Sequence, residues 1–291
     1  MTLSVLQHAQ ASAVAGSPYP YIVIPNALPA ELCERLIAGY PPPGELGVDT
    51  GRNNTRWSYP ACKVRENHAI DQSWRDIIAH HVSRAFYDEF LDLFGAAIVK
   101  QFPAAFPDEE MLRGLRLGLR EADSFDQADI LLDAQICGNT PVTRARSVKP
   151  THIDSHRKLF AGLLYLRRDD DDSVGGDLEV RRFRPDYSGR NRARCYDGVY
   201  VDNDCTDLVE TVRYEKNVLV MFINSLESLH GVTPRQPTPH ARLFMNLVGE
   251  VKTPLFDVPR TFRTRVKKLQ PGETGGWRIR RSLQVSLPVR D

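Results

Sequence analysis

The stretch Thr151-His152-Ile153-Asp154 is the segment from which the fold and chemistry of this chain can be worked out. His152 and Asp154 are two residues apart, so in an extended segment both side chains leave the same face and can reach one cation. His230 follows the apolar run at residues 218–222, where a returning strand can bring it to the same ion. We therefore predict a metal site formed by His152, Asp154 and His230.

Two imidazoles and one carboxylate form the facial triad of non-haem Fe(II) oxygenases, which leaves the opposite face of the metal open. The usual co-substrate of such iron, 2-oxoglutarate, chelates it through the ketone and one carboxylate, so its far carboxylate needs a cation. Arg242, twelve residues after His230, is the predicted anchor because a guanidinium pairs with a carboxylate in bidentate fashion. The alternation in residues 241–248 puts Arg242, Phe244 and Asn246 on one face of a strand.

In the order of these features the chain resembles the Fe(II)/2-oxoglutarate-dependent dioxygenases, and within them the prolyl 4-hydroxylase-like branch. The features are His152-x-Asp154, the segment at residues 159–166, Gly175-Gly176-Asp177-Leu178, His230-Gly231-Val232 and Arg242. The resemblance covers about residues 130–250, and the opening residues 19–29 look like a lead-in strand. It implies a mainly β fold with supporting helices, built on a cupin-like double-stranded β-helix, or jelly roll, with the metal at its open end.

The resemblance also implies a reaction: hydroxylation of an unactivated C–H bond, with succinate and CO2 as co-products. Fe(II), 2-oxoglutarate and O2 would be required, with ascorbate as a reductant. The leading substrate class is a polar small molecule or a sugar-containing molecule. One alternative is a peptidyl prolyl hydroxylase or another protein hydroxylase, and a second, from another class, is a cupin-like metal-binding protein without 2-oxoglutarate chemistry. Arg242 speaks against the second.

Further residues are candidates for contacts with the two substrates. Gln135 and Tyr165 lie on expected strands of the barrel and are predicted to hydrogen-bond the co-substrate. The candidate substrate contacts are Arg157, Asn246, Arg184 and Arg192. A surplus of cations at residues 157–158 and 181–194 favours an anionic substrate, unless these arginines pair with nearby acids such as those at residues 169–172.

Composition places the chain among ordinary soluble proteins, with 291 residues, 42% of them apolar and 26% charged. No run of 18 apolar residues and no signal-peptide pattern is present, so we expect a cytoplasmic protein without a membrane span. The five cysteines are odd in number and scattered, which indicates reduced thiols and neither a disulfide framework nor a structural zinc. Nucleic-acid binding is not expected, because the basic tail lacks interleaved aromatic residues.

The predicted organisation is a flexible start (residues 1–17), a single dioxygenase domain (18–250) and a basic C-terminal extension (251–291). Helices are expected at residues 29–38 and, from the spacing of apolar residues, over the whole of 71–94. Expected strands are at residues 21–24, 130–137, 159–166, 178–183, 199–201, 217–222 and 243–248. The polar insertion at residues 184–213 is expected to shape the substrate pocket.

Overall fold

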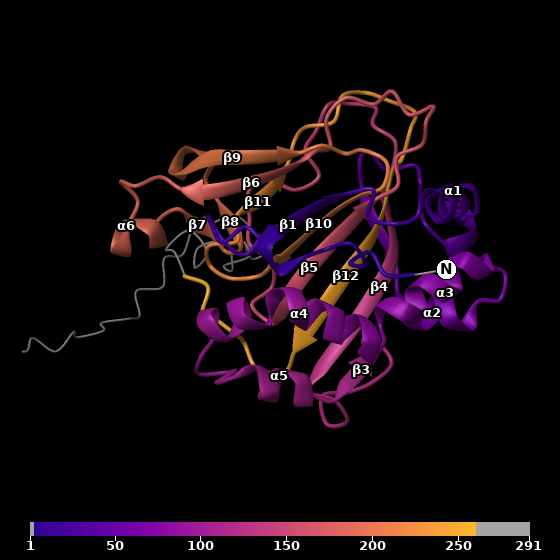
Figure 1. The fold of residues 1–291 in the computed structure, drawn as a ribbon. Coiled ribbons are helices and arrows are strands. Elements are labelled where there is room, and N and C mark those ends of the chain that lie inside the picture. Colours follow the sequence, from indigo (N-terminus) through magenta and orange to yellow (C-terminus); the bar gives the residue numbers. More distant parts are fainter. Residues whose placement is uncertain (1–2, 260–291) are drawn as a thin grey trace, which may run out of the picture.

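The computed structural model describes residues 3–259, so the predicted basic extension lies outside the described residues from position 260 onward. A seven-stranded sheet forms its centre (Figure 1). In spatial order the strands are β1 (Tyr21–Pro25), β10 (Val218–Ile223), β5 (Lys158–Tyr165), β12 (Arg242–Val251), β4 (Ile130–Asn139) and β2 (Arg56–Tyr59). A short strand, β3 (Leu117–Leu119), pairs with β4 in parallel, whereas the other pairs are antiparallel.

A smaller sheet lies beside the first and contains β11 (His230–Val232), β6 (Leu178–Phe183) and β9 (Thr206–Val212). Residues 151–153 extend it, because the backbones of His152 and His230 exchange two hydrogen bonds of 2.9 and 3.0 Å. On the other side of this segment lies a hairpin of β7 (Tyr196–Asp197) and β8 (Tyr200–Val201). The chain therefore moves repeatedly between the two sheets from β4 to β12.

Most helices precede the strands of the smaller sheet and pack against the large sheet (Figure 1). The helices are α1 (Ala30–Ala38), α2 (Ala61–Glu66), α3 (Gln72–His81), α4 (Arg84–Gln101), α5 (Glu109–Gly114) and α6 (Gly189–Ala193). Short 3₁₀ helices lie at Ala11–Ala13, Pro43–Leu46 and Asn203–Cys205. Within residues 3–259, every helix is too short or too polar to cross a lipid bilayer.

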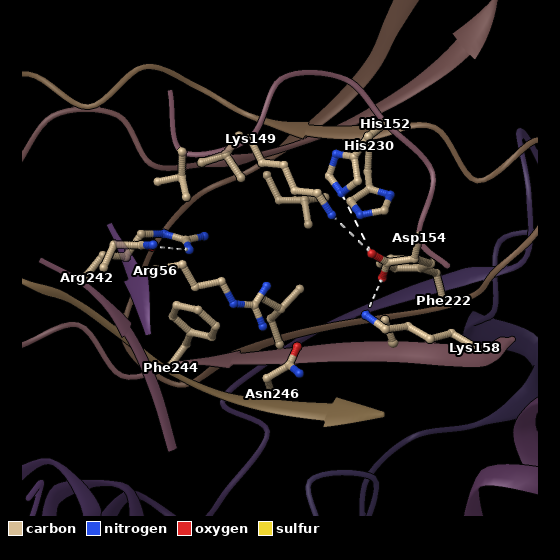
Figure 2. A pocket seen from close by; sticks show the side chains of 16 residues that line it. Arg56, Lys149, His152, Asp154, Lys158, Phe222, His230, Arg242, Phe244 and Asn246 are labelled. Atoms are coloured by element: carbon tan, nitrogen blue, oxygen red, sulfur yellow. Dashed lines mark hydrogen bonds and ion pairs between the residues drawn. The ribbon is translucent and has the colours of Figure 1, made fainter. Parts of the chain in front are cut away.

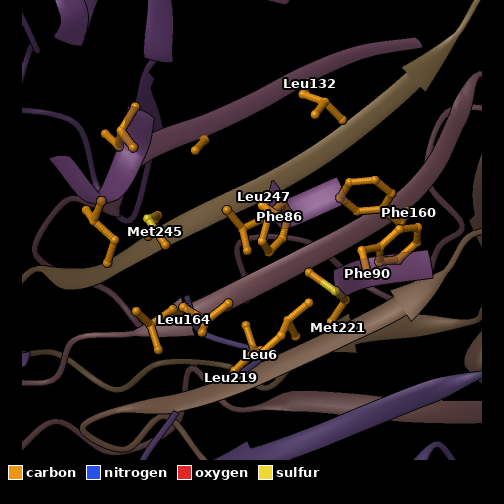
Figure 3. Close-up of a cluster of buried hydrophobic side chains, with 14 of the residues drawn as sticks. Leu6, Phe86, Phe90, Leu132, Phe160, Leu164, Leu219, Met221, Met245 and Leu247 are labelled. Carbon is orange, nitrogen blue, oxygen red and sulfur yellow. The ribbon is translucent and has the colours of Figure 1, made fainter. Parts of the chain in front are cut away.

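The main core lies between the helices and one face of the large sheet (Figure 3). Phe90 of α4 packs on Phe160 of β5, with ring centroids 4.2 Å apart. Strand pairing aligns Met221, Gly162 and Leu247 in one row across three strands. Burying each large apolar side chain in such a row stabilises the fold by about 1.5–3 kcal/mol. The predicted alternation in residues 241–248 is confirmed, since the odd-numbered leucine and methionine positions face this core.

The predicted helix at residues 71–94 is two helices, α3 and α4, and the prediction of one is wrong. The side chain of Ser83 accepts a hydrogen bond from the backbone N–H of Phe86, so Ser83 caps a new helix. Apolar residues recur at helical spacing on both sides of the break, which conceals it in the sequence. The predicted strands from residue 130 onward are confirmed to within a few residues, and β2, β3, β7, β9 and β11 are additional.

The prediction that all five cysteines are reduced is wrong for Cys195 and Cys205. They form a disulfide, with Cα atoms 6.1 Å apart. The β7–β8 hairpin reverses the chain between them, so two residues that are ten apart in sequence meet in space. Cys33, Cys62 and Cys137 are free thiols.

Candidate metal and co-substrate site

Three side chains at the end of the smaller sheet form a compact group of possible metal ligands (Figure 2). His152, Asp154 and His230 are all buried, and one ligand atom from each lies within 4.8 Å of the others. The Nε2 atom of His152 is 3.9 Å from Oδ1 of Asp154, and the two imidazole centroids are 4.1 Å apart. Because His152 and His230 are directly opposite in antiparallel pairing, their side chains leave the same face of the sheet.

Backbone carbonyls orient both imidazoles. Nδ1 of His152 lies 2.8 Å from the carbonyl oxygen of Pro150, and Nδ1 of His230 lies 2.8 Å from that of Ser228. A carbonyl oxygen can only accept a hydrogen bond, so each Nδ1 carries the proton and each Nε2 keeps a free lone pair. A hydrogen bond of this kind fixes the tautomer and ring orientation of a metal-ligating histidine.

The charges of the three groups also suit metal binding. Burial lowers the pKa of His152 well below its ordinary value and that of His230 to about 4, so both imidazoles are neutral at pH 7. Burial opposes ionisation of Asp154, yet Lys158 and Lys149 hold the pKa of its carboxyl well below the usual range. Neutral imidazole and ionised carboxylate are the protonation states that bind metal.

Lys149 and Lys158 approach the Asp154 carboxylate from two sides (Figure 2). Nζ of Lys149 is 3.3 Å from Oδ1, and Nζ of Lys158 is 3.2 Å from Oδ2. Two ammonium groups therefore share one carboxylate. When that carboxylate binds a divalent cation, the lysines lose much of their compensation.

Arg242 lies across the pocket from the triad and is only 2% exposed (Figure 2). Its guanidinium is 4.8 Å from the ring centroid of Tyr165 and 5.1 Å from that of Phe244. Nη1 donates a long hydrogen bond of 3.4 Å to Oδ1 of Asn139, whereas Nε and Nη2 have no partner among residues 3–259. Buried N–H groups without partners are costly, so this guanidinium is suited to an anionic ligand.

Gly175 and Gly176 have φ of +81° and +87°, a conformation that L side chains rarely adopt. A Cβ atom on Gly176 would lie 3.1 Å from the side chain of Arg235 and 3.2 Å from Cδ of Arg242. The glycine pair thus lets the backbone pass close to both arginines. This gives the Gly-Gly motif in the sequence a packing role beside the predicted anchor.

The pocket at this site is lined by both polar and apolar side chains. The polar ones are Arg56, Asn139, Lys149, His152, Asp154, Lys158, His230, Arg242 and Asn246. The apolar ones are Val148, Ala161, Leu163, Leu178, Phe222, Val232 and Phe244. Five of the residues predicted from sequence are therefore brought together: the three candidate metal ligands, Arg242 and Asn246.

Gln135 and Tyr165, predicted to contact the co-substrate, are buried but do not line the pocket. The Gln135 amide donates to Asp133 at 2.7 Å and accepts from Asn246 at 3.0 Å, so its hydrogen-bonding capacity serves the sheet. Tyr165 lies against the Arg242 guanidinium, and its buried hydroxyl has no partner in the described part of the chain.

Three arginines predicted to contact the substrate also lie outside the pocket lining. Arg157 is exposed. Arg184 is paired with Asp186 at 3.5 Å, and Arg192 is paired with Glu227 and lies 4.4 Å from the ring centroid of Phe183. The last two found acidic partners nearby, which is the alternative that the sequence left open.

Arg56 is a cationic lining residue that sequence reasoning missed, because residues 45–66 lack a long strand pattern. It begins β2, directly opposite Asn139 of β4, and its guanidinium lies 5.4 Å from the Phe244 ring centroid. The alternation Arg56-Trp57-Ser58-Tyr59, with only Trp57 buried, is the signal that could have identified the strand.

No family model matches the chain, and no curated protein does. Solved structures do resemble it. A Pseudomonas putida prolyl-4-hydroxylase is 14% identical with a TM-score of 0.43, over 80% of this chain and 93% of that one. HygX from Streptomyces hygroscopicus, with nickel and 2-oxoglutarate bound, is 12% identical with a TM-score of 0.38, over 80% and 83%.

SnoK from nogalamycin biosynthesis, a non-haem α-ketoglutarate-dependent carbocyclase, is 13% identical with a TM-score of 0.44, over 89% of this chain and 90% of that one. The structural neighbours of this chain are therefore prolyl 4-hydroxylases and other Fe(II)/2-oxoglutarate-dependent oxygenases, at low identity and low TM-score.

Proposed function

We propose that this chain is an Fe(II)/2-oxoglutarate-dependent oxygenase that hydroxylates an unactivated C–H bond of a polar small molecule. One observation carries the proposal: a buried His-Asp-His group and a buried guanidinium with unpartnered N–H groups line the same pocket. The first is the ligand set of a facial iron site. The second is the complement of a carboxylate.

In this proposal each residue has a defined task. Nε2 of His152, Nε2 of His230 and a carboxylate oxygen of Asp154 would hold the metal. Arg242 binds the far carboxylate of 2-oxoglutarate through Nε and Nη2, and the neighbouring Phe244 helps to exclude water from the pair. Bound Fe(II) supplies the O2 chemistry by which 2-oxoglutarate becomes succinate and CO2 while a C–H bond of the second substrate becomes C–OH.

We further propose that the two sheets form a double-stranded β-helix within a single domain at residues 18–250. The order in which the chain visits the sheets supports this. The strands β4, β5, β10 and β12 belong to the large sheet, and segment 151–153, β6, β9 and β11 belong to the small one. Eight strands distributed in this way over two sheets are typical of a jelly roll.

The buried guanidinium also bears on the alternative of a metal-binding protein without oxygenase activity. Such a protein needs the three metal ligands only. It gives no reason to bury Arg242 with Nε and Nη2 unpartnered, an arrangement that costs about 1–3 kcal/mol for each unsatisfied group.

The proposal is tested by calorimetry under anaerobic conditions on the full chain, first with Fe(II) and then with 2-oxoglutarate. We expect one Fe(II) per chain and 2-oxoglutarate binding that requires the metal. A screen of small molecules for substrate-dependent succinate release then identifies the second substrate. Failure of the metal-loaded protein to bind 2-oxoglutarate would contradict the proposal.

A further inference from the structure

The charges around the pocket are unbalanced. Its described lining holds four cationic side chains, Arg56, Lys149, Lys158 and Arg242, against a single carboxylate, that of Asp154. A divalent metal raises this surplus of three positive charges to five, and 2-oxoglutarate, with two negative charges, lowers it to three again. The proposed metal and co-substrate therefore leave the surplus unchanged.

The four cations differ in what already compensates them. Arg242 is assigned to 2-oxoglutarate in the proposed function. Lys149 and Lys158 both depend on Asp154, at 3.3 and 3.2 Å, and the proposed metal draws on the same carboxylate. Arg56 is exposed at the start of β2 and makes no ion pair within residues 3–259; its guanidinium lies 5.4 Å from the ring centroid of Phe244 and beside the Cys137 thiol. Arg56 therefore has no anionic partner in the described part of the chain, and a metal on Asp154 would weaken the one that Lys149 and Lys158 share.

We propose that the second substrate is a small organic acid, carrying a phosphate or carboxylate group that binds between Arg56 and Lys149. This inference rests on the proposed function and specifies its substrate class. A pocket lined by several cations attracts an anion, and a phosphate or carboxylate can accept hydrogen bonds from both guanidinium and ammonium groups. Figure 2 shows the two side chains entering the same pocket as the triad.

The position of Lys149 also restricts where the substrate reacts. Its Nζ atom is 3.3 Å from a carboxylate oxygen of the proposed metal ligand Asp154, so an acid group on Lys149 lies close to the metal. The hydroxylated carbon is then only a few bonds from that acid group. An uncharged prolyl residue in a peptide offers only carbonyl acceptors and no negative charge to Arg56 or Lys149, so the pocket favours the small acid over a peptidyl substrate.

The test uses the full chain saturated with Mn(II), a redox-inert stand-in for Fe(II), and 2-oxoglutarate. This complex is titrated by calorimetry with glycerol 3-phosphate, glycerate and glycerol. We expect saturable binding of at least one acid and none of glycerol, and the stronger of the two acids identifies the anionic group. Arg56→Gln and Lys149→Gln should each weaken acid binding about tenfold.

Arg182→Gln is the matched control, because Arg182 is exposed, pairs with Asp207 at 3.7 Å and does not line the pocket. Acid binding in this variant should equal that of the wild type. The dissociation constants of Mn(II) and 2-oxoglutarate are measured in every variant. In Arg56→Gln both dissociation constants should stay within about threefold of wild type, because Arg56 is assigned to the second substrate. A tenfold change, about 1.4 kcal/mol, would indicate a lost contact.

The outcomes separate the two proposals. If Mn(II) and 2-oxoglutarate do not bind, the proposed function fails. If they bind but neither acid does, or if both acids bind the Arg56 and Lys149 variants as tightly as the wild type, the acid-binding inference is overturned. It is also overturned if Arg56→Gln weakens 2-oxoglutarate as much as the acids, because Arg56 would then serve the co-substrate.

Discussion

The two faces of the large sheet differ sharply, although the same strands supply both. On β12, Leu243, Met245 and Leu247 join the apolar core beneath the helices (Figure 3). The residues between them, Arg242, Phe244 and Asn246, line the pocket. One face is therefore built for stability and the other for ligands, so substitutions on neighbouring residues should have separable effects.

The largest expected effect comes from removing a proposed metal ligand. His230→Ala should lower metal affinity by more than about a hundredfold and abolish turnover, because two ligands remain on a buried site. Metal content after dialysis with Fe(II) and a reductant measures it. His81→Gln changes another buried histidine, outside the pocket, and should retain the metal. Full iron occupancy and activity in His230→Ala would remove His230 from the ligand set.

The second effect concerns the pocket face of β12. Arg242→Leu should weaken 2-oxoglutarate by about 2–5 kcal/mol, roughly 30-fold to several thousandfold in Kd, because the co-substrate carboxylate loses its charged partner. The free energy of unfolding should change little, since Leu removes two unpartnered N–H groups, Nε and Nη2, and only one long hydrogen bond of 3.4 Å to Asn139. Calorimetry on the Mn(II) protein and urea unfolding measure the two quantities. An unchanged Kd would move the anchor elsewhere, with Lys149 next in line.

The third effect concerns the core face of β12, where we expect a loss of stability without a loss of 2-oxoglutarate affinity. Leu247→Ala should lower the free energy of unfolding by about 2–5 kcal/mol, because Leu247 is fully buried and truncation leaves a cavity. The Kd of 2-oxoglutarate should stay within about threefold, since Leu247 points away from the pocket. Urea unfolding monitored by tryptophan fluorescence checks the first value. A large loss of 2-oxoglutarate affinity without loss of stability would contradict the separation of the two faces.

The smallest expected effect is a dependence of stability on pH, carried by the helical layer. Burial lowers the pKa of His81 from 6.5 to about 3, and the neutral ring bridges the Ile77 carbonyl and the Val5 backbone N–H. The unfolded chain therefore takes up this proton first, so stability is full above pH 6.5 and falls by about 1.4 kcal/mol per pH unit down to pH 3.

Urea unfolding of metal-free protein at pH 7 and pH 5 measures this dependence. His81→Gln should be less stable at pH 7 but should lose about 2 kcal/mol less on acidification than the wild type, because one titrating group is gone. In the metal-free protein His152 and His230 also have lowered pKa values and contribute to the pH dependence. Both are present in the wild type and in His81→Gln, so their contribution cancels in the comparison. Equal slopes in the two proteins would contradict the role given to His81.

Prediction from sequence worked where the pattern was local. The His-x-Asp spacing placed both side chains on one face, and the alternation on β12 separated Arg242 from its core-facing neighbours. Prediction failed where one local sequence pattern is compatible with two different structures. Apolar residues at helical spacing continue across the break at Ser83, and arginines near the pocket could pair with acids or with a substrate.

The sequence by itself determined the candidate ligands, the strand-rich second half and the face on which each residue of β12 lies. These follow from backbone periodicity, which depends only on neighbouring residues. Only the tertiary structure decided that Arg56 meets Asn139 across β2 and β4, that Lys149 and Lys158 share Asp154, and that Cys195 meets Cys205. These contacts depend on which segments pack side by side, and that is determined by the burial of apolar surface over the whole chain.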